Sequence, residues 1–170
     1  QGEMRDELAA VLTKKIESPR IHNDAKGFSI TLPATWFSAY NNFITPKDAG
    51  THLQPLKTFE TGADIQVLHK PNVDWENGTM NMVVEHLNSW DYSWLKSYKH
   101  RDGSVEYFEI GSLLAVRLQA DVVFNKTPMT LYRIAVARNP DFILFSFMTP
   151  TEGFNDRKPT YDSIVQSLKF

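Results

Sequence analysis

The second half of the chain contains four long apolar segments that are joined by very short connections. The segments are SVEYFEIG, LLAVRLQADVVF, MTLYRIAVARN and FILFSFMTP, and they fill most of residues 104–150. They are separated only by Gly111-Ser112, Asn125-Lys126 and Asn139-Pro140-Asp141. All four are rich in Val, Ile, Phe and Tyr, as is typical of strands. Because connections this short join strands that lie next to each other and run in opposite directions, the pattern predicts an antiparallel sheet.

The last of these segments leads into an amphipathic helix. In YDSIVQSL, apolar side chains recur at helical spacing: Tyr161, Ile164, Val165 and Leu168. We expect this apolar face to cover the sheet. The stretch PTEGFNDRKP, just before it, mixes acids and bases and is predicted to be a solvated loop.

The first half of the chain alternates shorter predicted strands with turns. In GFSITLPATWF, Phe28, Ile30 and Leu32 alternate with polar residues, which predicts a half-buried strand ended by the following proline. Trp36 is then expected to plug the core. Further strands are predicted in NNFITP, ADIQVLHK and TMNMVVEHL. Residues 46–62 contain two prolines and two glycines and are predicted to form a loop.

Two more helices are predicted. Apolar residues recur every three or four positions in HLNSWDYSWLKSYKH, which predicts a helix over residues 89–99 with its stripe against the sheet: Leu87, Trp90, Trp94 and Tyr98. The opening MRDELAAVLTKKIES places acids early and lysines late, as the helix dipole favours. Residues 1–19 are therefore predicted to form an N-terminal helix or spacer.

Strands that follow one another, with a few helices beside them, are typical of the α+β class. We predict an αβα sandwich in which helices pack on a mostly antiparallel sheet of six or seven strands. With 170 residues in the chain, one core is the expected arrangement, and we assign residues 20–170 to a single domain.

The composition of the chain excludes several kinds of site and partner. Cys is absent, so disulfides, thiolate metal sites and cysteine nucleophiles are excluded. The net charge of -2 gives no overall attraction to nucleic acid, and we expect no partner of that class. No apolar run approaches the roughly 20 residues that span a bilayer, so membrane association would need an anchor upstream of Gln1.

Two stretches of the sequence resemble the PsbP-like superfamily. They are FSITLPATWF near the start and FILFSFMTPTEGFNDRKPTYDSIVQSLKF at the end. This superfamily has the PsbP or Mog-type fold and includes the DcrB-type and LpqN-type bacterial lipoproteins. The resemblance covers residues 20–170 and implies a compact αβα sandwich that works as a binding or assembly accessory. Its implication for function is an analogy at the level of fold.

The common catalytic signatures are missing from the sequence. No GxGxxG, GxxxxGK[ST], GxSxG or HExxH string occurs. His69, His86 and Glu85 are candidate metal ligands from separate segments, and Asp74 and Glu76 are candidate paired carboxylates. Isolated histidines and a solvated turn are the simpler interpretation, because a zinc site needs three or four converging ligands. We predict no catalytic residue, no metal and no cofactor.

Aromatic residues are the most informative candidates for a binding site. The chain has four Trp, of which Trp75 lies in a polar turn and Trp90 near the margin of the predicted helical stripe. Tyr92 lies off that stripe. Exposed large aromatics are enriched at binding hot spots. We therefore predict a recognition patch formed by Trp75, Trp90 and Tyr92, with burial of two of the three as the alternative.

Three function hypotheses follow. The leading one is a non-enzymatic accessory protein that recognises a protein partner and is exported to the periplasm or cell envelope, with a cytoplasmic location as the alternative. The second is a small-molecule or lipid carrier that uses a crevice between the sheet and helix 89–99. The third is a hydrolase whose site brings a distant His against a Ser or an acid.

Overall fold

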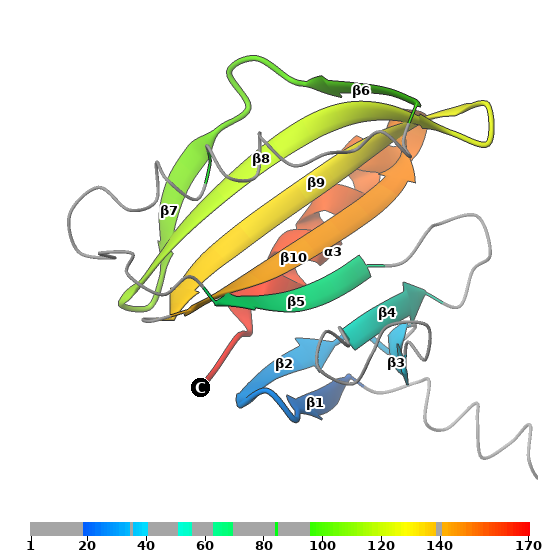
Figure 1. Ribbon diagram of the computed structural model, residues 1–170. Coiled ribbons are helices and arrows are strands. Elements are labelled where there is room, and N and C mark those ends of the chain that lie inside the picture. Colours follow the sequence, from blue (N-terminus) through cyan, green and yellow to red (C-terminus); the bar gives the residue numbers. More distant parts are fainter. Residues whose placement is uncertain are drawn as a thin grey trace, which may run out of the picture.

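Figure 1 shows how the strands and the terminal helix of the chain are arranged. The computed structural model describes residues 19–34, 36–40, 51–55, 63–69, 84, 96–138 and 141–170. Within these ranges the chain forms a large antiparallel sheet, a two-stranded sheet and one long C-terminal helix. The predicted N-terminal helix at residues 1–19 lies almost entirely outside the described residues.

The large sheet is built around the long hairpins of the second half of the chain. Its strand order is β3-β4-β5-β10-β9-β8-β6, and β7 also pairs with β8. The strand bounds are β3 Trp36–Tyr40, β4 Thr51–Pro55, β5 Ala63–His69, β6 Lys96–His100, β7 Glu106–Ile110, β8 Leu113–Phe124, β9 Thr127–Arg138 and β10 Asp141–Pro150. Every pairing between them is antiparallel, which confirms the α+β class predicted from the sequence.

Turn residues fix the register of the two long hairpins. Asn125 and Lys126 have φ angles of 48° and 64°, the left-handed conformation that a two-residue hairpin turn requires at both positions. Gly111 has a φ of 59° in the turn between β7 and β8. These turns place Phe124 opposite Thr127 and Ile110 opposite Leu113.

The small sheet is tied to the C-terminus. It consists of β1, Arg20–Asp24, and β2, Phe28–Leu32, whose apolar residues alternate inward as predicted. Ser29 and Lys169 exchange two backbone hydrogen bonds of 2.8 and 2.9 Å. The Thr31 N–H also donates to the Ser167 hydroxyl oxygen at 2.8 Å. The last residues of the chain therefore bind the edge of β2 that does not pair with β1.

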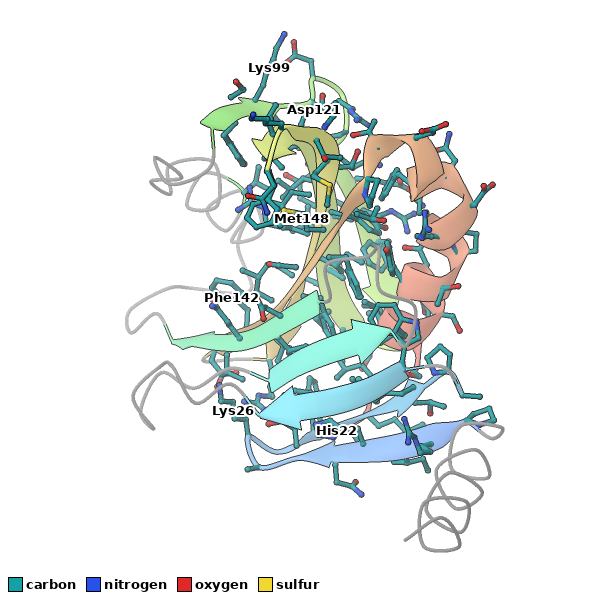
Figure 2. All side chains as sticks on the ribbon, turned by 90° about the vertical axis from the view of Figure 1, so that its right-hand side faces the viewer. His22, Lys26, Lys99, Asp121, Phe142 and Met148 are labelled. Carbon is teal, nitrogen blue, oxygen red and sulfur yellow. The ribbon has the colours of Figure 1, made fainter. Side chains whose placement is uncertain are left out.

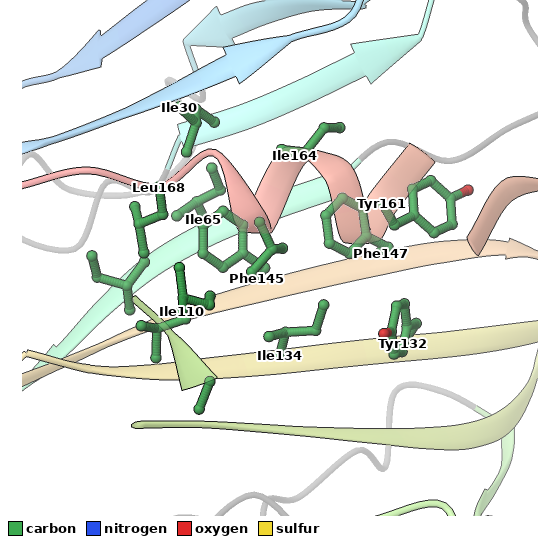
Figure 3. Packing of buried hydrophobic residues seen from close by; sticks show 14 of the residues in the cluster. Ile30, Ile65, Ile110, Tyr132, Ile134, Phe145, Phe147, Tyr161, Ile164 and Leu168 are labelled. Carbon is green, nitrogen blue, oxygen red and sulfur yellow. The ribbon is translucent and has the colours of Figure 1, made fainter. Parts of the chain in front are cut away.

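The main core lies between the sheet and the C-terminal helix. This helix, α3 (Phe154–Gln166), follows the short 3-10 turn η1 (Thr151–Gly153) and lies behind β9 and β10 in Figure 1. Tyr161 and Ile164 of this helix, and Leu168 just beyond its end, belong to the buried core cluster drawn in Figure 3, as predicted. The Phe147 and Tyr161 rings stack with centroids 4.5 Å apart. Fully burying one such side chain contributes about 1.5–3 kcal/mol, so these contacts stabilise the attachment of α3.

Trp36 plugs the same core, as predicted. It is 4% exposed, and its ring meets the Tyr161 and Phe147 rings edge to face at 5.9 and 6.5 Å. Because Trp36 is the first residue of β3, its burial joins that edge strand to α3. The Arg20 side chain donates to the Trp36 carbonyl and adds β1 to the same corner.

The opposite face of the sheet carries two smaller apolar clusters. One is formed by Val116, Leu118, Ala135, Phe142 and Leu144, with Val84, Val105 and Ala137 packed against it. The other is formed by Ala120, Val122, Met129 and Leu131, with Tyr98, Phe124 and Met148 beside them. Central strands β9 and β10 are thus buried on both faces, and their sequences are correspondingly rich in apolar residues.

Three predictions about single elements are wrong. The predicted loop 46–62 contains β4, because its prolines and glycines bracket a short strand and Pro55 ends it. The end of the predicted helix 89–99 is strand β6, in which Tyr98 and His100 turn inward while Ser97 and Lys99 are exposed. In the predicted strand 79–87, the one described residue, Val84, is helical; a short apolar run fits either structure.

The predicted loop before the terminal helix is also wrong. PTEGFNDRKP forms η1 and the first part of α3. Pro159 lies inside the helix, where it removes one backbone hydrogen bond. Phe154 offsets this cost, since its buried ring packs edge to face on Tyr132 at 5.5 Å. The predicted strand NNFITP lies outside the described residues.

Candidate functional site

The predicted aromatic patch lies outside the described residues, and so do the other candidates from the same segments. These are Trp75, Trp90 and Tyr92 of the patch, the carboxylates of Asp74 and Glu76, and the candidate ligands His86 and Glu85. Whether they form a site remains a prediction. In the part of the chain that the structure describes, no group of three or more His, Asp or Glu side chains could hold a metal ion.

One histidine, His22, lies beside a carboxylate. His22 Nε2 lies 3.2 Å from Asp24 Oδ2 on the same side of β1. Asp24 Oδ1 also accepts the Lys26 backbone N–H at 2.9 Å. The pair therefore belongs to the β1–β2 turn, where the carboxylate closes the chain reversal.

The structure contradicts part of the crevice that was predicted for a carrier. It was predicted between the sheet and helix 89–99, but residues 96–100 are part of the sheet itself as β6. Tyr98, predicted to line the crevice, packs against the apolar cluster of β8 and β9 instead. Residues 89–95 lie outside the described ranges.

A row of paired charges crosses from β7 over β8 to α3. We call Glu106, Arg117, Asp162 and Lys158, together with Tyr132, the charged row. Arg117 Nε donates to Glu106 Oε2 at 2.9 Å, a second Arg117 nitrogen donates to Oε1, and the guanidinium lies 4.7 Å from the centre of the Phe108 ring. Arg117 Nη1 lies 3.7 Å from Asp162 on α3. One guanidinium thus connects β7, β8 and α3.

Asp162 is the second centre of the charged row. Its carboxylate accepts the Tyr132 hydroxyl from β9 and the Lys158 ammonium, 2.8 Å away and one helical turn earlier. The pKa of Tyr132 is raised well above its usual value. Burial of the phenol is the largest cause, and its hydrogen bond to Asp162 is the second. The hydrogen bond from Arg117 lowers the pKa of Glu106. At neutral pH the Tyr132 phenol is therefore protonated and donates its hydrogen bond, and the Glu106 carboxylate is ionised.

This arrangement joins elements of the fold. The Arg117, Lys158 and Tyr132 donors are all directed at carboxylates of the protein, so the row holds the terminal helix against β8 and β9. A general acid or base near pH 7 would need a pKa close to 7. The shifts of Tyr132 and Glu106 go away from 7, so neither group is tuned for that role.

A second polar group closes the gap between β6 and β7. Both strands pair with β8, and between them the Arg101 backbone N–H and the Ser104 hydroxyl donate to the Gln119 carbonyl at 3.0 and 3.2 Å. The Arg101 side chain donates to Gln119 Oε1 at 2.6 Å and to Asp121. Figure 2 shows Asp121 and Lys99 together at this end of the sheet. The stretch of β8 around Gln119, between its pairings with β6 and β7, is thereby supplied with hydrogen bonds.

Arg133 is the most unusual buried residue. It lies in the middle of β9, on the face away from α3, and is 1% exposed. Its Nη2 donates to the Tyr98 hydroxyl oxygen, and its guanidinium lies 5.8 Å from the centre of the Tyr98 ring. Burial raises the pKa of Tyr98, and the Arg133 charge opposes that rise. Through these two contacts, Arg133 on β9 stabilises the position of β6.

Two large apolar side chains are exposed together near the turn between β7 and β8, whereas Ile21 and Phe170 are exposed elsewhere on the described surface. Tyr107 is 51% exposed and Leu114 is 44% exposed. Register places Glu109 opposite Leu114 and Tyr107 opposite Val116, so all four side chains lie on the face away from α3. We call Tyr107, Glu109 and Leu114 the hairpin patch. None of the ion pairs found among the described residues involves Glu109.

Sequence reasoning missed the hairpin patch. EYFEIGSLL has the alternation of an ordinary half-buried strand, and Tyr107 and Leu114 fit an inward face equally well. They are exposed because β7 lies outside β8 and beyond the central strands. The available signal was Glu109, a charge that shares a strand face with Tyr107.

No helix in the described ranges has the length and apolar character needed to cross a membrane. No family model matches the sequence, and no curated protein matches it either. Comparison of the structure with solved structures does find matches.

The matches share the fold at low sequence identity. A PsbP protein from Synechocystis superposes with a TM-score of 0.64 at 13% identity, covering 89% of this chain and 92% of that one. A Pseudomonas aeruginosa protein of unknown function, described as a putative regulator, gives 0.51 at 11% identity, covering 89% and 96%. A Bacteroides thetaiotaomicron protein gives 0.57 at 12% identity, covering 84% of this chain and 44% of that one. The agreement extends over most of the chain, as the resemblance of the two sequence stretches implied, and the chain has the PsbP-like fold.

Proposed function

We propose that this chain is a non-enzymatic accessory domain that recognises a protein partner. The observation that carries the proposal is the hairpin patch, where an aromatic and an aliphatic side chain are exposed next to each other. Exposed Tyr supplies a large contact area at low entropic cost and is enriched at interface hot spots. The predicted aromatic patch of Trp75, Trp90 and Tyr92 would add a second contact.

The charged row supports the same proposal from the other side of the sheet. Its titratable groups are directed at one another and hold α3 in place, and the pKa shifts of Tyr132 and Glu106 go away from neutrality. A rigid sheet with a covered core is a suitable scaffold for a binding surface. The PsbP-like fold adds an analogy to accessory proteins, since fold alone does not define function.

Affinity capture from an extract of the source organism tests this proposal. The wild-type chain is expected to retain a specific partner, and a Tyr107→Thr/Leu114→Thr double variant is expected to lose it. A Trp75→Ala/Trp90→Ala double variant measures the contribution of the aromatic patch separately. Identical capture profiles for the wild type and both double variants would refute recognition through either surface.

We also propose that the protein is exported to the periplasm or cell envelope, where an anchor upstream of Gln1 would attach it to a membrane. The resemblance to bacterial lipoproteins motivates this location. Fractionation of cells that express the full-length gene is expected to place the protein in the envelope fraction. Recovery in the cytoplasmic fraction would favour the cytoplasmic alternative.

A further inference from the structure

We infer that the hairpin patch binds an extended segment of a partner protein in which a basic residue adjoins a β-branched or aliphatic one. This inference rests on the proposed function and names the chemistry of the partner. It depends on three described side chains, Tyr107, Glu109 and Leu114, and on what lies beneath and beside them.

The apolar part of the patch continues a buried cluster. Val116, directly opposite Tyr107, is fully buried, and Val105 packs against the same cluster. The exposed Tyr107 and Leu114 are diagonal neighbours across the β7–β8 pair, and such neighbours lie about 7–8 Å apart. Aromatic and long side chains at that distance can reach each other, so the two form one apolar surface on which an aliphatic side chain can pack. A partner residue there would extend the apolar face of the sheet over the exposed end of the hairpin.

Glu109 gives the hairpin patch a negative charge. It is exposed, lies directly opposite Leu114, and takes no part in the ion pairs of the described chain. Glu106, on the other side of the same strand, is by contrast neutralised by Arg117. Among the described residues, Glu109 therefore places a negative charge beside the apolar pair of Tyr107 and Leu114. A Lys or Arg of a partner is its electrostatic complement.

The same charge argues against a second copy of this chain as the occupant. A two-fold contact centred on the patch would bring each Glu109 close to its own counterpart, because such contacts pair a surface with itself. Like charges placed opposite each other across strands are destabilising. A nucleic acid backbone, which is also negative, is disfavoured for the same reason.

A binding titration with defined peptides tests the inference. The probe is a short fluorescein-labelled peptide that alternates lysine and valine, and its counterpart alternates glutamate and valine. We expect the lysine peptide to bind the wild-type chain and the glutamate peptide to show no binding. Tyr107→Thr is expected to weaken binding about tenfold, and Glu109→Gln about two- to fivefold with a reduced dependence on salt.

The matched control is Glu152→Gln, which removes another exposed carboxylate, located in η1 on the helix side of the sheet. It should leave the affinity for the lysine peptide unchanged. The inference is overturned if the lysine peptide does not bind, if the glutamate peptide binds equally well, or if Glu152→Gln weakens binding as much as Glu109→Gln. Circular dichroism on each variant confirms that the fold is intact.

The outcome can be separated from that of the proposed function. If affinity capture identifies a partner that Glu109→Lys and Tyr107→Thr retain as well as the wild type does, the chemistry inferred for the patch is wrong while protein recognition stands. If wild-type capture yields no specific partner and the lysine peptide binds as expected, the patch chemistry stands and the proposed function fails.

Discussion

The two sides of the β7–β8 hairpin use charge in opposite ways. On the side that faces α3, Glu106 is bound by Arg117, and Arg117 in turn approaches Asp162 of the helix. On the other side, Glu109 lies between exposed apolar groups and joins no ion pair of the described chain. The two glutamates are three positions apart on one strand, so the difference comes from what faces them.

Because of this difference, we expect one side of the hairpin to contribute to stability and the other side to recognition. Charges that satisfy each other within the chain hold elements together and have little left to offer a partner. A charge without such a complement, beside exposed apolar groups, costs little in solvent and is ready for an intermolecular contact. Substitutions on the helix side should therefore change the free energy of unfolding, and substitutions on the patch side should change binding.

The largest effect is expected in the core beneath the helix side. Ile164→Ala removes a fully buried side chain from the middle of α3. We expect the free energy of unfolding in urea to fall by about 2–5 kcal/mol, because the change leaves a cavity under the helix. Ser163→Ala, at the neighbouring exposed position, is the control and should change it by no more than about 0.5 kcal/mol. A loss below about 1 kcal/mol for Ile164→Ala would show that α3 contributes little to the fold.

The next largest effect on stability tests the hydrogen bond between Tyr132 and Asp162. Tyr132→Phe removes the hydroxyl that donates to this carboxylate and should cost about 1.5 kcal/mol in urea unfolding at neutral pH. The pKa of Tyr132 is raised in the folded state, so the folded chain holds this proton more tightly than the unfolded chain. The stabilisation is therefore complete below the ordinary tyrosine pKa of about 10 and declines as pH rises above it. Wild type and variant should converge in stability at high pH, and a constant difference would contradict the assignment.

A smaller effect is expected from Arg117. Arg117→Met keeps an unbranched side chain over Phe108 and removes the cation, at a cost of about 1 kcal/mol or less. Because Arg117 lowers the pKa of Glu106, its contribution is present above the ordinary carboxyl pKa and is lost as pH falls below about 4.5. Thermal unfolding of wild type and variant at several pH values should show a difference that narrows in acid. A difference that widens in acid would mean that Glu106 is not the partner that matters.

The smallest effect on stability is expected in the hairpin patch. Leu114→Thr keeps a side chain suited to strands and removes exposed apolar area. We expect the free energy of unfolding in urea to change by less than about 0.5 kcal/mol. A loss of more than about 1.5 kcal/mol would show that Leu114 belongs to the core, and the contrast between the two sides of the hairpin would disappear.

The sequence was informative where local chemistry decides structure. The strands of residues 104–150, their turns and the apolar face of the terminal helix follow from periodicity and from residues such as Asn125 that suit a hairpin turn. Strand β6 and the first part of α3 were not predicted, because hydrogen bonds to β8 and the burial of Phe154 decide them. The hairpin patch was beyond sequence reasoning for a similar reason: that β7 lies outside β8 is a property of the assembled sheet.

The most direct test of the separation between stability and recognition measures both quantities on the same two variants. Urea unfolding and lysine-peptide affinity would be determined for Arg117→Met and for Tyr107→Thr. The account predicts that Arg117→Met lowers stability and leaves affinity unchanged, whereas Tyr107→Thr weakens binding about tenfold at nearly constant stability. If both variants shift stability and affinity together, the two sides of the hairpin act as one unit and the account is contradicted.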